Sequence, residues 1–332
     1  MGGTALKNTE TRRHTSDEYF AKCDAILSKV RASTILRYNR IDVIPAYHNK
    51  ESFGDVDILY STDTDEPFSV ADIQKEFNPH EIIKNGDVIS FDFEGLQVDM
   101  IRAKMDYYRY AFNYFSYNDV MGNFVGKIAR HFGLSHGHDG LYLKIRNETG
   151  DMIDKILVTY DFAKTIEFLG LGPEYKNGFY TLEDAFRYVQ SSKYFNPEVY
   201  KLENVSAIGR VRDRKRITYR KFLEFNESYE GPCYIPEKDK SIYLPLIFFM
   251  FEGTKERFES AINKYIIAKV LAAKFNGVIV SLATGLTDKN LGQFMRYLKS
   301  KPMFTETFLL FLPETIIFNN IKKEFKTYIN TH

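Results

Sequence analysis

One short stretch of the sequence decides the fold: Ser52-Phe53-Gly54-Asp55-Val56-Asp57-Ile58-Leu59. Its alternation of polar and apolar residues predicts a strand with Asp55 and Asp57 on one face and Val56 and Ile58 on the other. Two carboxylates on the same face of a strand raise each other's pKa unless cations neutralise them. We therefore expect this strand to bind Mg²⁺, which prefers carboxylate and phosphate oxygens.

A third acidic residue comes from a strand about forty residues later. Residues 88–101 predict a β-hairpin whose second strand carries Asp99 between apolar Val98 and Met100. Asp92, on the first strand of the hairpin, is the rival for the third position. An Asp-x-Asp pattern by itself is more often a solvated strand face, but a later acid-bearing strand favours a site that clamps two cations about 4 Å apart.

The elements around these strands predict an α+β protein with a mixed sheet and flanking helices. Helices are expected at residues 16–31, 69–77, 118–131, from 181 to before 197, 255–275 and 288–299. The segment after about residue 200 is expected to be mostly helical. We predict an N-terminal arm and helix at 1–39, a sheet-containing segment at 40–117, a further subdomain at 118–203 and a mostly helical C-terminal domain at 204–332.

The composition is that of an ordinary soluble globular protein, with 332 residues, 44% hydrophobic and 27% charged. A net charge of +1 means that any nucleic-acid partner must be held by a local basic patch. Cys23 and Cys233 are too few for a disulfide framework, which favours a reducing cytosol. The polar first thirty residues predict no signal peptide. The apolar stretches at 243–251 and 303–318 are short or interrupted, so we expect a cytoplasmic protein with no membrane-spanning segment.

The densest basic run lies at residues 209–221, with Tyr219 and Phe222 within or beside it. Basic side chains between aromatic ones suit a nucleic-acid backbone and stacked bases, although a solvated helix face explains the pattern equally well. The candidate nucleic-acid-binding residues are Arg210, Arg212, Arg214, Lys215, Arg216 and Arg220.

Three stretches resemble the nucleotidyltransferase superfamily, and within it the DNA polymerase beta-like (family X) palm and thumb. Residues 54–59 are similar to the metal-binding strand of that family, residues 98–100 to its third-carboxylate strand, and residues 114–121 to the segment that opens its thumb. Residues 133–141 and 181–188 resemble the rest of that thumb. The resemblance covers roughly residues 40–200, about half of the chain, and implies a palm at 40–117 and a thumb-like subdomain at 118–203.

The resemblance implies an Mg²⁺-dependent transfer of a nucleotide from an NTP or dNTP to the 3′-hydroxyl of DNA or RNA, with Mn²⁺ as the alternative metal. Asp55 and Asp57 would bind both ions, and Asp99 would bind the catalytic ion and help to deprotonate the hydroxyl. The family's nucleotide pocket would here be lined by Tyr114, Phe115 and Asp119.

The sequence departs from that family in two places. The family has a Gly-Ser pair about ten residues before its first acid, whereas residues 43–50 contain none. Gly54 leaves room for a triphosphate, and His48 and Lys50 are candidates for the missing phosphate contacts. The N-terminal Gly2-Gly3 with Arg12-Arg13 is another candidate, if it folds back. Only about forty residues precede the palm, which argues against a gap-filling repair polymerase.

The leading hypothesis is therefore a nucleotidyltransferase acting on a nucleic-acid 3′ end, as a DNA polymerase or as an RNA or tRNA end-modifying enzyme. One alternative is nucleotidyl transfer to a protein or small molecule, in which the basic run has no role. Another is a catalytically inactive nucleic-acid-binding module. A palm enzyme this compact would suit a virus or phage.

Overall fold

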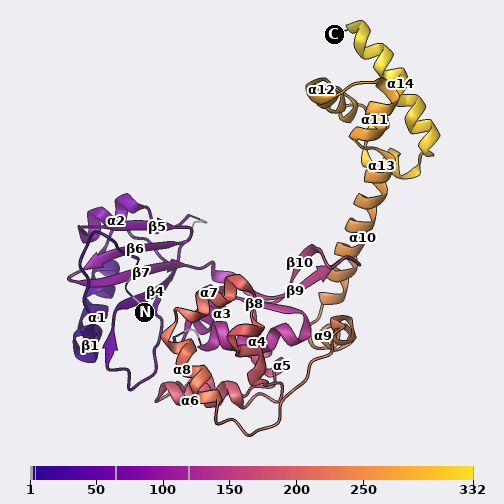
Figure 1. Cartoon of the computed structure of the whole chain (residues 1–332). Helices are drawn as coiled ribbons and strands as arrows, with labels where there is room; N and C mark the ends of the chain where they lie inside the picture. Colours follow the sequence, from indigo (N-terminus) through magenta and orange to yellow (C-terminus); the bar gives the residue numbers. More distant parts are fainter. Residues whose placement is uncertain (1–2, 4, 64–65, 119, 332) are drawn as a thin grey trace. The chain divides into compact units, whose positions relative to one another are not determined.

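The computed structural model describes residues 3, 5–63, 66–118 and 120–331 (Figure 1). Of these described residues, 54% are helical and 16% lie in strands, and the mixed sheet confirms the predicted α+β class. The chain separates into two compact units. Unit 1 comprises residues 1–144 and 155–254, and unit 2 comprises residues 145–154 and 255–332. The finer division into palm and thumb stays a prediction.

The main sheet of unit 1 has five strands in the order β2-β4-β7-β6-β5. The two central strands, β4 and β7, run parallel, whereas the other neighbours are antiparallel. The register places Asp57 opposite Asp99 and Asp55 opposite Gln97. The strand bounds are β2 Arg40–Val43, β4 Asp55–Ser61, β5 Ile82–Asn85, β6 Val88–Phe93 and β7 Leu96–Arg102.

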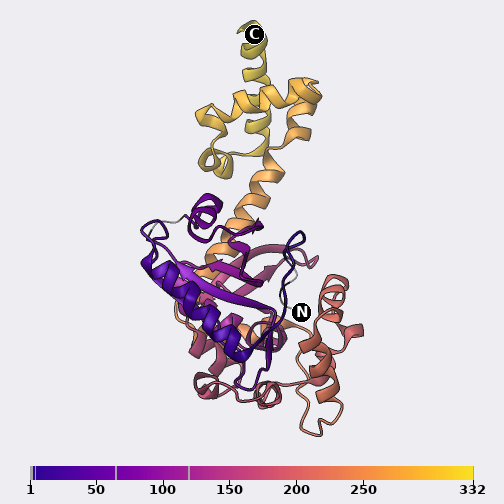
Figure 2. The same ribbon diagram turned by 90° about the vertical axis from the view of Figure 1, so that its left-hand side faces the viewer.

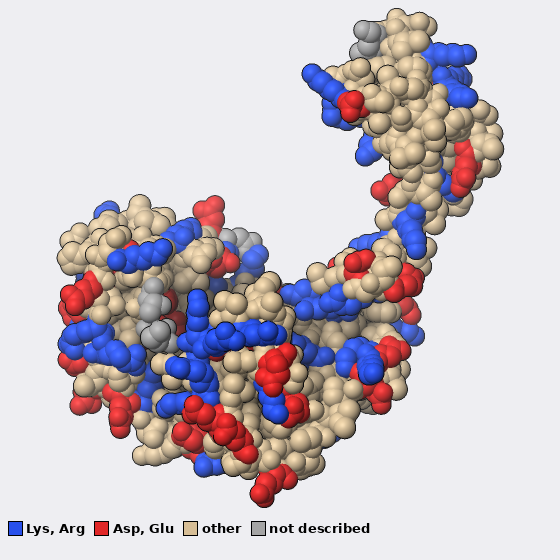
Figure 3. Space-filling model, in the orientation of Figure 1, with Lys and Arg blue, Asp and Glu red and all other residues tan. Residues whose placement is uncertain are grey.

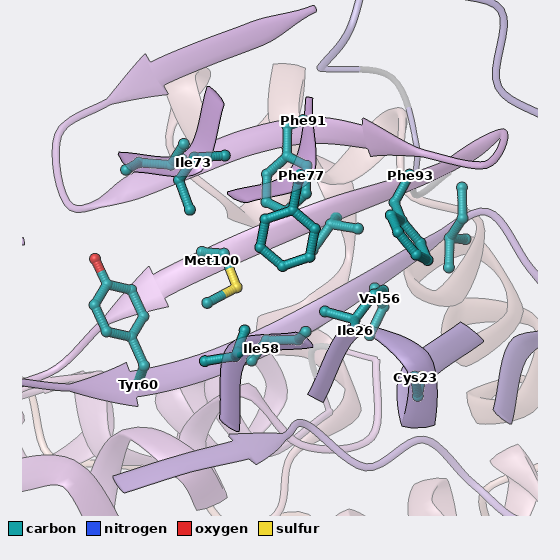
Figure 4. Close-up of a cluster of buried hydrophobic side chains, with 14 of the residues drawn as sticks. Cys23, Ile26, Val56, Ile58, Tyr60, Ile73, Phe77, Phe91, Phe93 and Met100 are labelled. Carbon is teal, nitrogen blue, oxygen red and sulfur yellow. The ribbon is translucent and has the colours of Figure 1, made fainter. Parts of the chain in front are cut away.

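Two helices cover one face of this sheet, α1 (Ser16–Ala32) and α2 (Val70–Phe77) (Figure 2). The apolar residues of β4, Val56, Ile58 and Tyr60, point into the core beneath these helices, as Figure 4 shows. All three are 0% exposed, as the predicted alternation requires. Ser69 caps α2. Thr15, in a capping box with Glu18, caps α1.

The opposite face of the sheet is only partly covered, by α3 (Tyr108–Phe115). A small apolar cluster forms where Leu59 and Ile101 meet Tyr108 and Ala111. The Tyr108 hydroxyl donates to the backbone carbonyl of Leu59 at 2.9 Å. Asp55 and Asp57 share this face with Leu59 because side chains alternate along β4. The acidic residues therefore lie beyond the part of the face that α3 covers.

The remaining elements of unit 1 are short helices and strands. The segment predicted as one helix over 118–131 consists of a π-helix (Val120–Phe124), α4 (Val125–Ala129) and a 3₁₀ turn (Arg130–Phe132). Asn118 does not cap it, because its φ of 57° is left-handed whereas an N-cap is extended. The other elements are β1 His14–Thr15, β3 Ser52–Phe53, β8 Leu134–Gly137, β9 Gly140–Arg146, β10 Met152–Thr159, α5 Phe162–Phe168, α6 Leu182–Gln190, α7 Ala207–Arg214, α8 Ile217–Asn226 and α9 Leu244–Met250.

Unit 2 is helical apart from the strand residues at 145–154. The helix predicted at 288–299 forms with those bounds, and the one predicted at 255–275 forms within one residue of them. The segment Thr254–Thr284, two helices separated at Phe275 and Asn276, is by length and composition long and apolar enough to cross a membrane, with a mean hydropathy of 1.7 in its best window. The expectation that no segment reaches this length is therefore wrong, because Lys269 and Lys274 are the charged residues of its second half and the rest is mostly apolar. The helices are α10 Thr254–Lys274, α11 Gly277–Thr284, α12 Asp288–Lys299, α13 Glu306–Phe311 and α14 Glu314–Thr331.

Candidate active site

Asp55, Asp57 and Asp99 converge at the centre of the sheet. One carboxylate oxygen from each lies within 4.8 Å of the other two, and all three side chains are half-buried. Asp57 and Asp99 are register partners on the parallel strands β4 and β7, so they emerge side by side on the open face. Among the described residues this is the group of His, Cys, Asp and Glu side chains close enough to share a metal ion. The predicted convergence is confirmed.

Asp92, the rival third carboxylate, has a structural role. Its side chain is 4% exposed and accepts hydrogen bonds from the Glu81 backbone N–H at 2.8 Å and from His80, whose Nδ1 is also 2.8 Å away. Burial opposes ionisation, but these hydrogen bonds hold the pKa of Asp92 below its usual value. Asp92 therefore ties the start of β5 to β6 and does not join the acidic cluster.

The electrostatics of the acidic cluster are clearest at Asp99. Burial raises the pKa of Asp99, and the negative charge of Asp55 adds to this effect. Hydrogen bonds from Ser90 and Gln97 counteract part of it. A carboxylate with a raised pKa is a stronger base, and a cation placed between the three side chains would relieve their repulsion. The cluster is thus poised to bind a cation or to accept a proton.

The N-terminal segment, Gly3 with residues 5–13, lies against this cluster and is called the strap below. The Gly3 N–H donates to Asp55 Oδ2 at 3.0 Å. The backbone N–H groups of Ala5 and Leu6 donate to Gln97 Oε1 at 2.9 and 3.4 Å. A Cβ at position 3 would lie 2.3 Å from the carbonyl oxygen of Gly54, so the strap contacts the entrance of β4 backbone to backbone. The expected fold-back of the N-terminus is confirmed for Gly3.

A cavity of about 470 Å³ opens beside Asp55 and Asp57. Four cationic side chains line it: Arg13 of the strap, Lys50, Arg216 immediately before α8, and Lys221 on α8. Ile217 and Thr218 at the N-terminus of α8 also line it, where backbone N–H groups and the helix dipole favour anions. The remaining lining residues are Tyr19, Ile44, Pro45, Ala46, Tyr47, Ser52, Gly54, Ile101, Phe115, Asn118 and Leu182.

Lys50 lies in this cavity near the acidic cluster. Its Nζ lies 4.4 Å from the centre of the Phe53 ring and 3.5 Å from Asn118 Oδ1. Burial lowers the pKa of Lys50, whereas the charges of Asp55 and Asp57 oppose that shift. The acidic cluster and the cationic wall thus face one space, an arrangement that suits a ligand carrying both phosphates and metal ions.

The predicted nucleotide-binding residues divide between the cavity and its surroundings. Gly54, Lys50 and Phe115 line the cavity. His48 is exposed and lies outside the lining, with its backbone N–H bonded to the Phe179 carbonyl. The Tyr114 ring packs 4.9 Å from the His136 ring, also away from the lining. Asp119 lies outside the described residues.

The residues of the predicted nucleic-acid-binding run also lie in different environments. Arg210 donates to the backbone carbonyl of Leu202, and Arg212 bonds Asp213 and Asn123, so both stabilise the local fold. Arg216 lines the cationic cavity beside Asp55 and Asp57. The other three residues of the run, Arg214, Lys215 and Arg220, are exposed. Figure 3 shows Lys and Arg side chains gathered over α7 and α8.

The two aromatic residues of this run are not available for stacking on bases. Tyr219 is 1% exposed and Phe222 is 0% exposed, and the Phe222 ring stacks 4.2 Å from Phe124 in the core. The predicted alternation of basic and aromatic residues thus arises from an amphipathic helix, whose aromatic side faces inward.

The site residues missed in the sequence are Gln97, which contacts Asp99 and the strap, and Lys221, which lines the cavity. Gln97 sits two residues before Asp99 on the same strand face, and this spacing was the available signal. The all-oxygen donor set of the cluster fits Mg²⁺ or Mn²⁺. A scan of the chain against protein-family models finds no match, and a search of curated proteins finds none either. The candidate site is therefore defined by its own geometry: three converging carboxylates beside a cationic cavity.

Proposed function

We propose that the chain is a metal-dependent nucleotidyltransferase that moves a nucleotide from an NTP or dNTP to the 3′-hydroxyl of a nucleic acid. The observation that carries the proposal is the pairing of the acidic cluster with the cationic cavity, which is lined by Asp55 and Asp57 on one side and by Lys50, Arg216 and Lys221 on another. A nucleoside triphosphate with its metal ions presents the matching charges. The resemblance of residues 54–59, 98–100 and 114–121 to the family X palm supports the same reaction.

The carboxylates and the cations have separate tasks in this proposal. Asp55, Asp57 and Asp99 would hold two Mg²⁺ or Mn²⁺ ions, which supply charge neutralisation and a clamp for the attacking and leaving oxygens when bound. Lys50, Lys221 and the N-terminus of α8 bind and orient the phosphates in place of the missing Gly-Ser pair. The chain thus contributes mainly positioning and electrostatic stabilisation.

Asp99 is the residue best suited to take the proton of the attacking hydroxyl. Burial raises its pKa, which makes its carboxylate the stronger proton acceptor. Gln97 donates to both of its oxygens and keeps the side chain in one orientation. Proton acceptance at Asp99 therefore depends on the Gln97 contact as well as on burial.

The direct test incubates the full chain with labelled NTPs or dNTPs, Mg²⁺ or Mn²⁺ and a mixture of DNA and RNA primers. We expect primer extension, lost by at least about a hundredfold in Asp55→Asn and Asp99→Asn, because each variant removes one anionic metal ligand. Asp92→Asn is the matched control and retains activity. Absence of incorporation on every primer, together with unaltered binding of a strand, would favour an inactive nucleic-acid-binding module.

The acceptor class is tested separately at the exposed basic residues. Charge reversal of Arg214, Lys215 and Arg220 leaves the cavity lining intact. For a nucleic-acid acceptor we expect weaker primer binding and a shallower dependence of that binding on salt, because fewer phosphates are neutralised. Full activity in the charge-reversed variant would instead point to a protein or small-molecule acceptor.

A further inference from the structure

Unit 2 contains a groove of about 650 Å³ between α12 and the C-terminal half of α14. It is distinct from the cationic cavity of unit 1, since all of its lining residues belong to residues 286–329. Its lining combines aromatic, amide and cationic side chains. These residues are Leu286, Asn290, Gln293, Arg296, Tyr297, Phe325, Tyr328 and Ile329.

The floor of the groove is a set of half-buried aromatic rings. The Tyr297 and Tyr328 rings lie 4.9 Å apart at an angle of 56°. Both pack against Phe294, which is fully buried, at centroid distances of 5.8 and 5.0 Å. The Tyr297 hydroxyl donates to Glu324 Oε2 at 3.0 Å, which fixes the ring from its polar end. The core therefore holds these rings in place while they form the floor of the groove.

The rim of the groove is polar and follows one side of α12. Asn290, Gln293 and Arg296 are three residues apart, so they lie on adjacent turns, and all are exposed. Their amide and guanidinium groups supply both hydrogen-bond donors and acceptors. Such groups recognise the edges of unpaired bases, whose faces stack on aromatic rings. The rim and floor together match the two surfaces of a nucleobase.

The charge of the surrounding segment favours a polyanion. Residues 255–332 contain twelve Lys and Arg against six Asp and Glu, although the whole chain has a net charge of only +1. Lys301 Nζ lies 4.3 Å from the centre of the Tyr297 ring, beside the groove floor. Lys299, Lys322 and Lys326 on the two groove helices are exposed, and Figure 3 shows basic side chains on both sides of unit 2. A strand laid in the groove would thus meet cations along its backbone.

We propose that this groove binds a single-stranded segment of RNA or DNA, with bases stacked on Tyr297 and Tyr328 and contacted at their edges by Gln293 and Arg296. The inference rests on the proposed function only in choosing a nucleic acid among polyanions. It gives the acceptor strand a second binding site, separate from the one that handles the reacting hydroxyl.

The test measures binding of the full chain to fluorescent 12-nucleotide single strands of RNA and of DNA, by anisotropy in EDTA and without nucleotide. Tyr328→Leu keeps apolar volume but removes the stacking ring, and Arg296→Ala removes a rim contact. We expect about tenfold weaker binding in Tyr328→Leu, since stacking on one aromatic ring is worth about 1–3 kcal/mol, and a smaller loss in Arg296→Ala. Tyr265→Leu and Arg257→Ala on α10 are the matched controls. Circular dichroism and the melting temperature establish that each variant is folded.

The outcomes separate this inference from the proposed reaction. Asp55→Asn should bind the strands like the unaltered chain while failing to extend a primer. Unchanged affinity in folded Tyr328→Leu and Arg296→Ala would overturn the groove proposal, whether or not the chain incorporates nucleotides. Equal affinity for duplex DNA or heparin would overturn it too, because neither offers unpaired bases. The RNA and DNA arms show which strand the groove prefers.

Discussion

The side-chain nitrogen of Gln97 lies 3.0 Å from each carboxylate oxygen of Asp99. The same amide accepts the backbone N–H groups of Ala5 and Leu6 through its oxygen, so Gln97 connects the acidic cluster to the strap. Gln97 is 2% exposed, and its contacts exchange little with water. One buried amide therefore positions a carboxylate and fixes a terminal segment at the same time.

Replacing Gln97 by Leu should shift metal binding towards higher pH. The hydrogen bond from Gln97 lowers the pKa of Asp99, so its loss leaves burial and the Asp55 charge to raise that pKa further. Metal binds the ionised carboxylate, and binding is lost as the pH falls through the pKa of Asp99. We therefore expect the acid limb of Mn²⁺ binding to move to higher pH. Titration of Mn²⁺ between pH 5 and pH 8 measures it. Gln74→Leu, at an exposed position on α2, should leave the curve unchanged.

Neutralising Asp57 should stabilise the metal-free protein and remove its response to metal. Three carboxylates within 4.8 Å repel one another, so Asp57→Asn relieves repulsion in EDTA. The unaltered chain gains about 2.7 kcal/mol at a metal concentration of 100 times Kd, since only the folded state binds. Thermal melts with and without Mg²⁺ give both effects. A Mg²⁺-induced rise that persists in Asp57→Asn would show that the ion binds elsewhere.

Lys221→Ala should weaken nucleotide binding without affecting folding, because Lys221 is exposed and lines the cavity. Loss of one phosphate contact to a cation costs about 1.5–3 kcal/mol, or roughly a tenfold to hundredfold rise in Kd for a nucleoside triphosphate. Equilibrium binding of a fluorescent nucleotide, with tripolyphosphate as competitor, measures it. Lys215→Ala is the control, since Lys215 is exposed nearby but outside the lining. Equal losses in both variants would indicate a diffuse charge effect.

Asp213→Asn should strongly destabilise unit 1. Asp213 and Lys127 form a buried pair at 3.3 Å, with side chains 1% and 2% exposed. Removing one partner leaves the other charge uncompensated, a loss of about 3–5 kcal/mol in the free energy of unfolding. Urea unfolding at pH 7 measures the change. Glu198→Gln, which breaks an exposed pair with Lys201, should have a much smaller effect.

The contribution of Lys127 to the stability should rise between pH 8 and pH 10.5, while buried tyrosines with raised pKa values, such as Tyr108 and Tyr188, contribute in the opposite direction near pH 10. Burial lowers the pKa of Lys127 to about 8, with the Asp213 charge opposing the shift, and its ordinary value is 10.5. Between these values Lys127 binds more protons in the unfolded chain than in the folded chain, so its contribution to the free energy of unfolding increases with pH. The Lys127→Met variant should lose this contribution when urea unfolding is repeated across that window. An identical pH dependence in the variant would exclude Lys127 as its source.

The position of Asp55 and Asp57 on one face of β4 could be predicted from the sequence, because it follows from the period of two residues along a strand. Burial of Val56 and Ile58 forces Asp55 and Asp57 onto the opposite face, and this requires no knowledge of the rest of the chain. The pairing of Asp99 with Asp57 needed one further assumption, that β4 and β7 are neighbours. The start of α6 near residue 181 and the bounds of α12 were predicted for a similarly local reason.

The rest of the site depends on contacts between residues far apart in the sequence. Gly3 meets Asp55 across 52 residues, and Lys221 reaches the same cavity from a helix more than 160 residues later. The periodicity of apolar residues along the chain gives no information about such long-range contacts. The basic run misled for a related reason, since its composition does not show that Tyr219 and Phe222 face the core while Arg210 and Arg212 bond the local backbone and Asp213.

The strap has a practical consequence for the biochemistry of this protein. Any purification tag joined ahead of Gly3 would begin close to an amide that is 3.0 Å from Asp55. A polyhistidine tag there would bring imidazole groups close to the carboxylates, and Ni²⁺ carried over on the tag would compete with the Mg²⁺ or Mn²⁺ that the assays add. An affinity handle placed ahead of the strap should therefore be cleaved off before any metal measurement.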